Sequence, residues 1–244
     1  AGVSAQKTIK VGATPVPHAD ILNLLVPVLA EQGVNLVVIE FTDYVLPNLT
    51  LAEGEIDANF FQHTPYLDRF NKDHNLNLVP LAGVHIEPLG FYSNKIKSLD
   101  DLPQGATIAI PGDAVNGGRA LLLLQSAGLI KVDPKAGIEP TVFDVTENKL
   151  GLRFVELEAA QLPRALADTT AAVINGNYAL EAGLVPTRDA IFLEGKESPY
   201  VNILVVRAED RDNPDLKKLA DALQSDLIRD FILSTYDGGV VPAF

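Results

Sequence analysis

Residues 107–128, TIAIPGDAVNGGRALLLLQSAG, join a short apolar run to a helical pattern and set the expectation for the fold. The run TIAI predicts a buried strand, and residues 119–127 predict a helix that Gly128 ends. The same alternation recurs along the chain. Repeated β–α units predict parallel sheets covered by helices, so the sequence indicates the α/β class.

Further elements are expected on both sides of this stretch. Strands are predicted at residues 8–12, 35–41, 59–61, 78–82, 89–93, 154–157, 171–174 and 201–206, and helices at 19–33, 64–70, 162–167, 178–182 and about 214–236. Pro27 should kink or restart the first of these helices. Because no loop-rich linker divides the chain, a two-lobed division must use strand-like crossings, and residues 84–92 and 199–206 are the candidates.

The composition excludes several classes of protein. The 244 residues carry 19 Lys and Arg against 32 Asp and Glu, a net charge of −13, which argues against nucleic-acid and anionic-membrane binding. Cysteine is absent, so disulfides and thiolate sites are excluded, and four scattered histidines make a multi-histidine metal site unexpected. No apolar run approaches a membrane span of about 20 residues. The start, AGVSAQK, lacks the regions of a signal peptide, as expected of a processed, exported chain or a trimmed one.

The stretch NFFQHTPY at residues 59–66 carries the first candidate site. A strand end leads there into a helix start, where Phe61, His63 and Tyr66 can converge. Aromatic rings with one imidazole suit an apolar, polarizable ligand group. The alternative is an aromatic mini-core with a satisfied histidine.

Two further groups of polar residues stand out. The turn NGGR at residues 116–119 places free N–H groups and Arg119 at a helix start, which favours an anion such as a carboxylate, although an uninvolved surface arginine fits as well. Asn175 and Asn177 follow a strand, and Asn202 lies within one, where asparagine needs partners for its amide. An edge-strand asparagine facing water is the alternative for Asn202.

Catalytic constellations are harder to assemble. The nucleophile-elbow motif Gly-x-Ser-x-Gly and the zinc motif His-Glu-x-x-His are both missing. Asp43, Asp57 and His63 could act as acid and base, yet nothing supplies a nucleophile or a metal beside them.

Taken together, the motifs resemble those of the methionine-binding lipoproteins of bacterial ABC importers. The segments that carry the resemblance are residues 11–18 (VGATPVPH), 40–48 (EFTDYVLPN), 54–63 (GEIDANFFQH), 85–88 (HIEP), 158–164 (EAAQLPR), 172–175 (AVIN), 198–202 (SPYVN) and 241–244 (VPAF). They follow one another over nearly the whole chain. The lipidated N-terminal cysteine by which members are commonly tethered is absent here.

This resemblance implies a two-lobed periplasmic-binding-protein fold with two crossover strands and a ligand enclosed between the lobes. Lobe 1 would hold residues 1–86 and 203–244, and lobe 2 residues 87–202. The family's aromatic side-chain site would match Tyr44, Phe61, His63 and Tyr66. Arg119 would match the carboxylate-binding arginine, with Asn116 at the same turn, and Asn177 and Asn202 would match the amides that hold the amino-acid backbone.

The resemblance also implies the function. The chain is expected to be a monomeric binding protein, not an enzyme, that captures L-methionine outside the cytoplasm and delivers it to the permease of an ABC importer, without cofactor or metal. It would be periplasmic or at the cell surface, lipid-anchored in its native form. Alternative ligands are D-methionine, a methionine dipeptide or another apolar amino acid. Alternative classes are a small-molecule hydrolase using His63 with Asp57, and a surface adhesion protein.

Overall fold

A computed structural model describes residues 6–244, which form two compact units. The first unit holds the chain up to Ile86 together with Ser198–Phe244, and the second holds Glu87–Glu197. Residues 198–202, assigned to the second lobe from sequence, fall in the first unit because the strand that begins at Val201 pairs only with strands of that unit. The expectation about N-terminal processing concerns residues 1–7, of which residues 1–5 lie outside the described residues.

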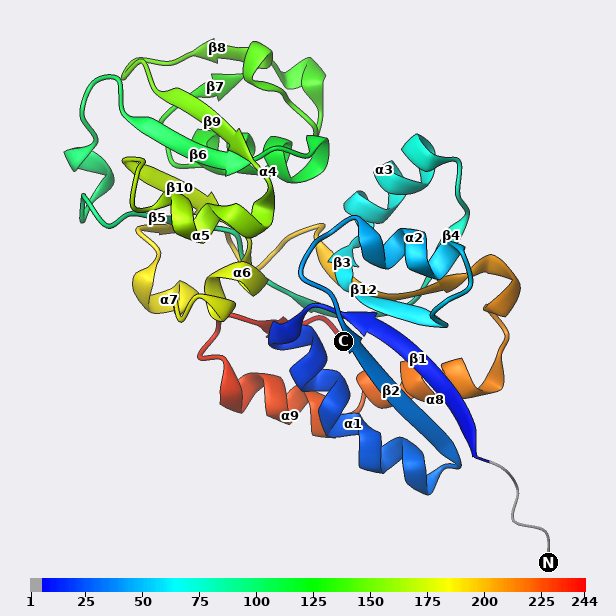
Figure 1. Cartoon of the computed structure of the whole chain (residues 1–244). Coiled ribbons are helices and arrows are strands. Elements are labelled where there is room, and N and C mark those ends of the chain that lie inside the picture. The colour runs from blue at the N-terminus through cyan, green and yellow to red at the C-terminus, as the bar shows by residue number, and fades with distance from the viewer. Residues whose placement is uncertain (1–5) are drawn as a thin grey trace, which may run out of the picture. The chain divides into compact units, whose positions relative to one another are not determined.

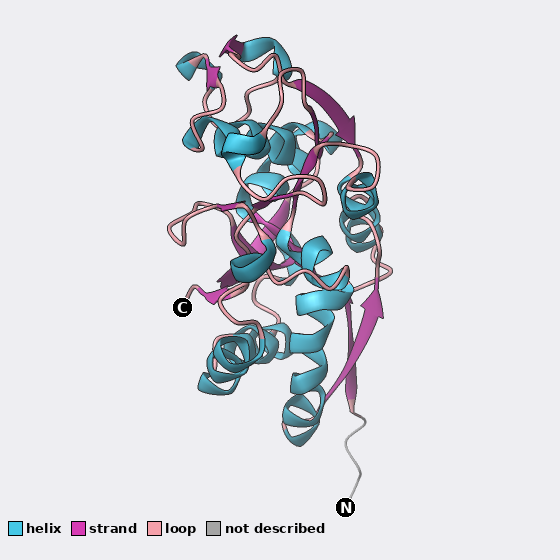
Figure 2. Ribbon diagram, turned by 90° about the vertical axis from the view of Figure 1, so that its left-hand side faces the viewer, coloured by secondary structure: helices cyan, strands magenta, loops and turns pink. Residues whose placement is uncertain are grey.

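The first unit is built on a six-stranded sheet with the order β13-β4-β12-β3-β1-β2 (Figure 1). Its strands are β1 (Lys7–Ala13), β2 (Val34–Glu40), β3 (Ala58–His63), β4 (Leu78–Ile86), β12 (Val201–Arg207) and β13 (Val241–Pro242). β1 pairs in parallel with β2 and β3, whereas β12 runs antiparallel to both β3 and β4. The C-terminus follows β13 at the edge of this sheet (Figure 2).

Helices cover both faces of the first sheet. They are a π-helical turn η1 (Pro15–Ala19), α1 (Asp20–Glu31), α2 (Leu46–Ala52), α3 (Thr64–His74), a 3-10 turn η6 (Ala208–Asp210), α8 (Pro214–Leu223) and α9 (Asp226–Thr235). Figure 1 shows α1 and α8 on one side of β1 and β2, and α2 and α3 beside β3 and β12. A buried cluster that includes Leu51, Leu67 and Val205 fills the space beneath α2 and α3.

The second unit has its own five-stranded sheet, in the order β11-β5-β10-β6-β9, and a small two-stranded one. The strands are β5 (Gly90–Tyr92), β6 (Thr107–Pro111), β9 (Arg153–Leu157), β10 (Ala171–Ile174) and β11 (Phe192–Leu193), with β7 (Lys131–Val132) and β8 (Val145–Glu147) forming the small sheet. The helices are α4 (Ala114–Ser126), α5 (Leu162–Ala165), α6 (Gly176–Glu181) and α7 (Pro186–Asp189), with 3-10 turns η2 (Leu99–Asp101), η3 (Pro134–Ala136), η4 (Val142–Asp144) and η5 (Ala159–Gln161).

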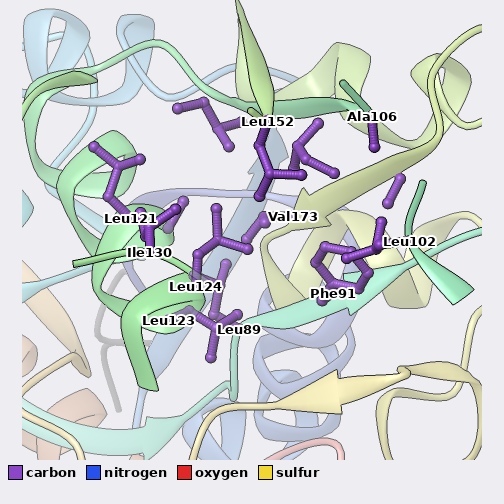
Figure 3. Packing of buried hydrophobic residues seen from close by; sticks show 14 of the residues in the cluster. Leu89, Phe91, Leu102, Ala106, Leu121, Leu123, Leu124, Ile130, Leu152 and Val173 are labelled. Atoms are coloured by element: carbon purple, nitrogen blue, oxygen red, sulfur yellow. The ribbon is translucent and has the colours of Figure 1, made fainter. Parts of the chain in front are cut away.

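A separate hydrophobic core holds the second unit together. One buried cluster includes Leu121 and Leu124 of α4, Phe91 of β5 and Val173 of β10 (Figure 3). Burial of such side chains contributes roughly 1.5–3 kcal/mol each, so this unit carries a stabilising core of its own.

The parallel sheets expected from the sequence are found only in part. β1, β2 and β3 are parallel to one another, as are β10, β6 and β9, and each of these strands is followed by a helical crossover. β4 and β12, which lead into and out of the second unit, are antiparallel neighbours, and so are β5 and β10. A strand that does not return through a helix is free to pair antiparallel, which the β–α alternation does not reveal.

Three predicted helices differ from the observed ones. α4 begins at Ala114, well before residue 119, because the Asp113 side chain caps it by accepting a hydrogen bond from the Asn116 N–H at 3.0 Å. The predicted helix 214–236 is two helices, since Ser225 is extended and its hydroxyl donates to the Ala222 carbonyl. α1 continues through Pro27 as one helix. None of the helices within residues 6–244 has the length and apolar character of a membrane span.

Candidate functional site

A chain of three buried polar side chains crosses the first unit. The Thr14 hydroxyl lies 2.8 Å from Nδ1 of His18, and Nε2 of His18 lies 2.8 Å from Oδ1 of Asn202. Thr14 precedes η1, His18 lies within it, and Asn202 sits in β12 opposite His63 and His85. Sequence reasoning identified Asn202 but missed its two partners, because His18 lies 184 residues away along the chain.

This chain fixes which way the Asn202 amide faces. An amide oxygen only accepts, so His18 donates from Nε2 to Asn202 Oδ1, and Nδ1 can accept from the Thr14 hydroxyl. The Asn202 amide nitrogen is thereby turned away from His18, and it has no hydrogen-bond partner among residues 6–244. With Asn202 only 5% exposed, this arrangement presents two amide N–H donors to an acceptor.

Two histidines that looked scattered in the sequence are neighbours in space. The rings of His18 and His85 lie 5.1 Å apart, and both meet the edge or face of Phe60. Both ring nitrogens of His18 are already hydrogen-bonded. Holding a metal ion there would require breaking the chain to Asn202, so the pair is arranged for packing and orientation.

The predicted aromatic cluster is assembled at the end of β3. Phe61 and Tyr66 are buried, their ring centroids lie 6.0 Å apart, and each is about 6 Å from the ring of half-buried Tyr44. The Tyr66 hydroxyl donates to the Tyr44 carbonyl at 2.6 Å, and the Tyr66 N–H donates to Nδ1 of His63 at 3.2 Å. His63 therefore caps α3, and the rings are held in fixed positions.

A buried amide network fixes the segment that carries Tyr44. Asn48 and Gln62 exchange hydrogen bonds of 2.7 and 2.9 Å, and Asn59 donates to Asn48 Oδ1 at 2.9 Å. Since Asn48 belongs to α2 and the other two to β3, the network ties α2 to the strand. The sequence analysis did not identify these amides, although Asn59 and Gln62 directly flank Phe60 and Phe61 in the quoted stretch.

In the second unit, Arg119 is buried and ion-paired. Its Nε and Nη2 atoms donate to the two carboxylate oxygens of Glu194 at 2.9 and 2.6 Å, and Nη2 also donates to the Glu87 carbonyl at 3.0 Å. The main chain of Glu194 is bonded to Leu89, which brings the beginning and the end of this unit together at Arg119.

The ion pair changes what Arg119 can offer a ligand. Nε has one N–H group and Nη2 has two, and all three are used by Glu194 and Glu87. A ligand carboxylate could therefore not take Nε or Nη2 of Arg119 unless Glu194 or the Glu87 carbonyl moves away. The two-pronged grip expected from the sequence is here made with a carboxylate of the protein itself.

The asparagines of the second unit form a second polar chain. Asn116 donates from Nδ2 to both Asp113 oxygens at 3.2 Å, and its Oδ1 accepts from Nδ2 of Asn175 at 3.2 Å. Partial burial raises the pKa of Asp113, and hydrogen bonds from Asn116 oppose that shift. Asn177, also buried, follows in the first turn of α6. Gly117 and Gly118, expected to form an anion-binding loop with Asn116, lie instead inside α4.

The predicted site residues thus form two groups. Tyr44, Phe61, His63, Tyr66 and Asn202 lie in the first unit, and Asn116, Arg119 and Asn177 in the second.

The acid–base pair considered for a hydrolase is not formed. Asp57 accepts from the Lys10 N–H at 2.8 Å and lies just before β3, whereas His63 ends that strand.

Comparison with known proteins adds to this geometry. The family model described as NlpA lipoprotein matches residues 9–244. The D-methionine-binding lipoprotein MetQ of Escherichia coli is 48% identical over 213 residues, which cover 86% of this chain and 79% of that protein. The corresponding protein of Yersinia pestis is 45% identical over 97% of this chain and 89% of its own length. The structure of a nutrient binding protein from Burkholderia cenocepacia bound to methionine matches with a TM-score of 0.94 and 49% identity, over 97% of this chain and all of that one.

Proposed function

The chain belongs to the NlpA lipoprotein family, and on that basis we propose that it captures methionine outside the cytoplasm and delivers it to an ABC importer. The observation that carries the proposal is the aromatic cluster beside an amide whose two N–H donors are unused. A lipid-anchored native form at the periplasmic face or cell surface fits the lipoprotein names of the relatives.

The aromatic cluster is proposed to receive the thioether side chain. Phe61, Tyr66 and Tyr44 present ring edges and faces about 6 Å apart, with His63 at the same strand end. Burial of a methionine side chain contributes roughly 1.5–3 kcal/mol, and each sulfur–aromatic contact adds roughly 0.3–1.5 kcal/mol. The hydrogen bonds that hold Tyr66 let these rings bind without reordering.

Polar side chains are proposed to bind the amino-acid backbone of the ligand. Because His18 holds its oxygen, Asn202 offers N–H donors and suits the carboxylate, not the ammonium group. Arg119 contributes a positive charge. Asn116 and Asn177 are the other proposed contacts in the second unit. The Asn116 amide is held in place by its hydrogen bond from Asn175.

Binding, not catalysis, is the proposed activity. Asp57 accepts from the Lys10 N–H and lies 3.8 Å from Arg207. Asp43 accepts from the N–H groups of Val45 and Leu46, where the chain enters α2. Neither carboxylate is placed as a partner for His63. Stoichiometric binding without turnover is therefore expected.

Calorimetric titration of protein that has been unfolded and refolded to remove bound ligand tests the proposal. L-methionine should bind, and at about 100 times its dissociation constant it should add about 2.7 kcal/mol to the free energy of unfolding. D-methionine, a methionine dipeptide and norleucine define the ligand range. Glutamate should hardly bind, because its side-chain carboxylate would lose water without gaining a partner.

Two outcomes would contradict the proposal. A flat titration with every methionine-containing ligand would exclude methionine capture. Equal affinity for glutamate and norleucine would exclude the cluster of Phe61 and Tyr66 as the side-chain site. Mass spectrometry of the material released on unfolding identifies the ligand independently.

A further inference from the structure

The amide network of the first unit is closed on itself. Asn48 donates to Oε1 of Gln62 at 2.9 Å, and Gln62 donates to Oδ1 of Asn48 at 2.7 Å and to Oδ1 of Asn59 at 3.0 Å. Asn59 donates in turn to Asn48 Oδ1 at 2.9 Å. Turning any of these amides over would bring two oxygens or two nitrogens face to face. The network therefore has a single hydrogen-bonded arrangement.

The network lies in the core, where an amide is costly. Asn48 and Asn59 are fully buried, and Gln62 is 3% exposed. Apolar side chains of similar shape would fill these positions at lower cost, because an amide loses its water on burial. A fully hydrogen-bonded polar network, in contrast, holds its members in one arrangement, which apolar packing does less strictly. These three amides are therefore better suited to fixing positions than to adding stability.

The part of the chain that the network holds is the start of α2, directly after the turn that carries Tyr44. Asn59 also donates to the Pro47 carbonyl at 3.1 Å, so the first turn of α2 is bonded to β3 through its main chain as well. Packing contributes little at the preceding residues, because Val45 and Leu46 are 48% and 53% exposed. The place of Tyr44 relative to β3 therefore depends on hydrogen bonds.

Tyr44 in turn borders the aromatic cluster. Its ring centroid lies 6.0 Å from that of Phe61 on β3 and 5.9 Å from that of Tyr66 on α3. The strand that anchors the network thus also carries one wall of the cluster. A shift of α2 along β3 would change the distance between Tyr44 and Phe61, and with it the room left for a ligand side chain.

We propose that Asn48, Asn59 and Gln62 are positioning residues that limit how bulky a ligand side chain the aromatic cluster accepts, by fixing the place of Tyr44. The proposal rests on the proposed function, since it concerns selectivity at the same site. Without the network, α2 would still pack on the core through Leu51, but its first turn would be free to shift.

The test compares L-methionine with L-ethionine, which has one more methylene beyond the sulfur. One variant combines Asn48→Leu, Asn59→Leu and Gln62→Met, which replace the amides by apolar groups of similar size. Gln62→Met and Tyr44→Leu are made singly and together, as a double-mutant cycle. Asn71→Leu is the matched control, because the Asn71 amide ties α3 to Leu78 of β4 in the same unit, outside the network.

The expected result is a loss of selectivity that does not follow stability. The wild type should prefer methionine by about 10-fold or more, the usual value of one methylene in a close-fitting site, and the triple variant by less than about threefold. Gln62→Met strands two buried amides, so it should melt at a lower temperature than the triple variant. Asn71→Leu should also lower the melting temperature, but it should keep the wild-type preference.

The double-mutant cycle shows whether the network acts through Tyr44. Gln62→Met should weaken methionine binding by roughly 3- to 10-fold in the wild-type background, about the value of one hydrogen bond. In the Tyr44→Leu background the further loss should be less than about twofold, because the residue that the network positions is already gone.

Other outcomes separate this proposal from the proposed function. If the wild-type protein binds no methionine, the proposed function fails and the positioning role fails with it. If the wild type binds methionine, a wild-type preference in the triple variant overturns the positioning role alone, as do additive losses in the cycle or an equal loss of preference in Asn71→Leu. Should the triple variant not fold, an unchanged preference in Gln62→Met overturns it.

Discussion

Single hydrogen bonds decide which ligand group each asparagine can meet. At Asn202 the amide oxygen is taken by His18, which leaves donors, whereas at Asn175 the amide nitrogen is taken by Asn116, which leaves an acceptor. Sequence patterns identify buried asparagines but give no information on the direction of their amides, which depends on partners distant in the chain.

His18 is expected to act through Asn202. His18→Phe keeps a ring beside Phe60 but removes the donor that orients the amide, so methionine binding should weaken by roughly 3- to 30-fold, the loss of about one hydrogen bond. His18→Gln, which retains an N–H donor, should recover part of the affinity. Calorimetry with methionine and with 3-(methylthio)propylamine, which lacks the carboxylate, makes the comparison.

A uniform loss for both ligands in the His18→Phe variant would contradict an effect through the carboxylate. Ligand-free melting curves of both variants show whether the fold is retained.

Tyr92 is the residue whose burial has the clearest consequence for stability. Burial and, to a smaller extent, the charge of Asp189 raise the pKa of Tyr92, and its hydroxyl has no hydrogen-bond partner within residues 6–244. The neutral phenol is therefore favoured in the folded state. An unfolded tyrosine ionises near pH 10, so the free energy of unfolding should fall as the pH rises above about 10.

Tyr92→Phe removes both the unpaired buried hydroxyl and the group that ionises at high pH. Loss of an unsatisfied buried hydroxyl should raise the free energy of unfolding at pH 7 by about 1 kcal/mol, and the decline above pH 10 should become shallower. Urea unfolding at several pH values measures this. Tyr236→Phe is the control, because that hydroxyl lies 3.4 Å from Asp20; a stability gain in the control but not at Tyr92 would contradict the argument.

At the scale of elements, most strands and the longer helices could be predicted, because they follow from runs of apolar residues and from helix stops. The residues at which helices begin were harder to predict. α4 begins at Ala114 because Asp113 caps it, yet the glycines at 117 and 118 resembled a loop. The ion pair of Arg119 could not be predicted either, because Glu194 lies 75 residues further along the chain.

The glycines of α4 serve close packing. A Cβ on Gly118 would lie 2.8 Å from both the Glu139 Cα and the Ile138 carbonyl. Gly118→Ala should lower the free energy of unfolding by about 1–3 kcal/mol, although alanine favours a helix by about 1 kcal/mol over glycine. Gly195→Ala, which meets open space, should change it by less than about 0.5 kcal/mol. Equal effects of the two substitutions in denaturant titrations would contradict the packing explanation.

At the scale of the whole molecule, the second unit is an insertion between two neighbouring strands of the first. Ile86 of β4 is the register partner of Val201 of β12, so the chain leaves the first sheet and returns to it at one place. The resemblance to a known family predicted the two crossings and an insertion of this kind. The β–α pattern alone did not, because antiparallel pairing between strands so far apart leaves no local signal.

This topology predicts that the two units fold separately. The fragment 87–197 contains its complete five-stranded sheet and its own core, which includes Phe91, Leu124 and Val173. Joining Ile86 to Ser198 through Gly-Gly would turn β4 and β12 into a hairpin with a five-residue loop, a common length. Both products should show cooperative thermal unfolding, at lower temperatures than the whole chain because smaller domains bury a smaller share of their surface.

Circular dichroism and scanning calorimetry of the two products test this separation. Neither product should bind methionine with the affinity of the whole chain, since each keeps only one of the two groups of proposed ligand contacts. A fragment 87–197 without a cooperative transition would show that its core needs the first unit. Full methionine affinity in the joined product of the first unit would instead show that the contacts proposed for Arg119 and Asn177 are dispensable, because the aromatic cluster and Asn202 would then suffice.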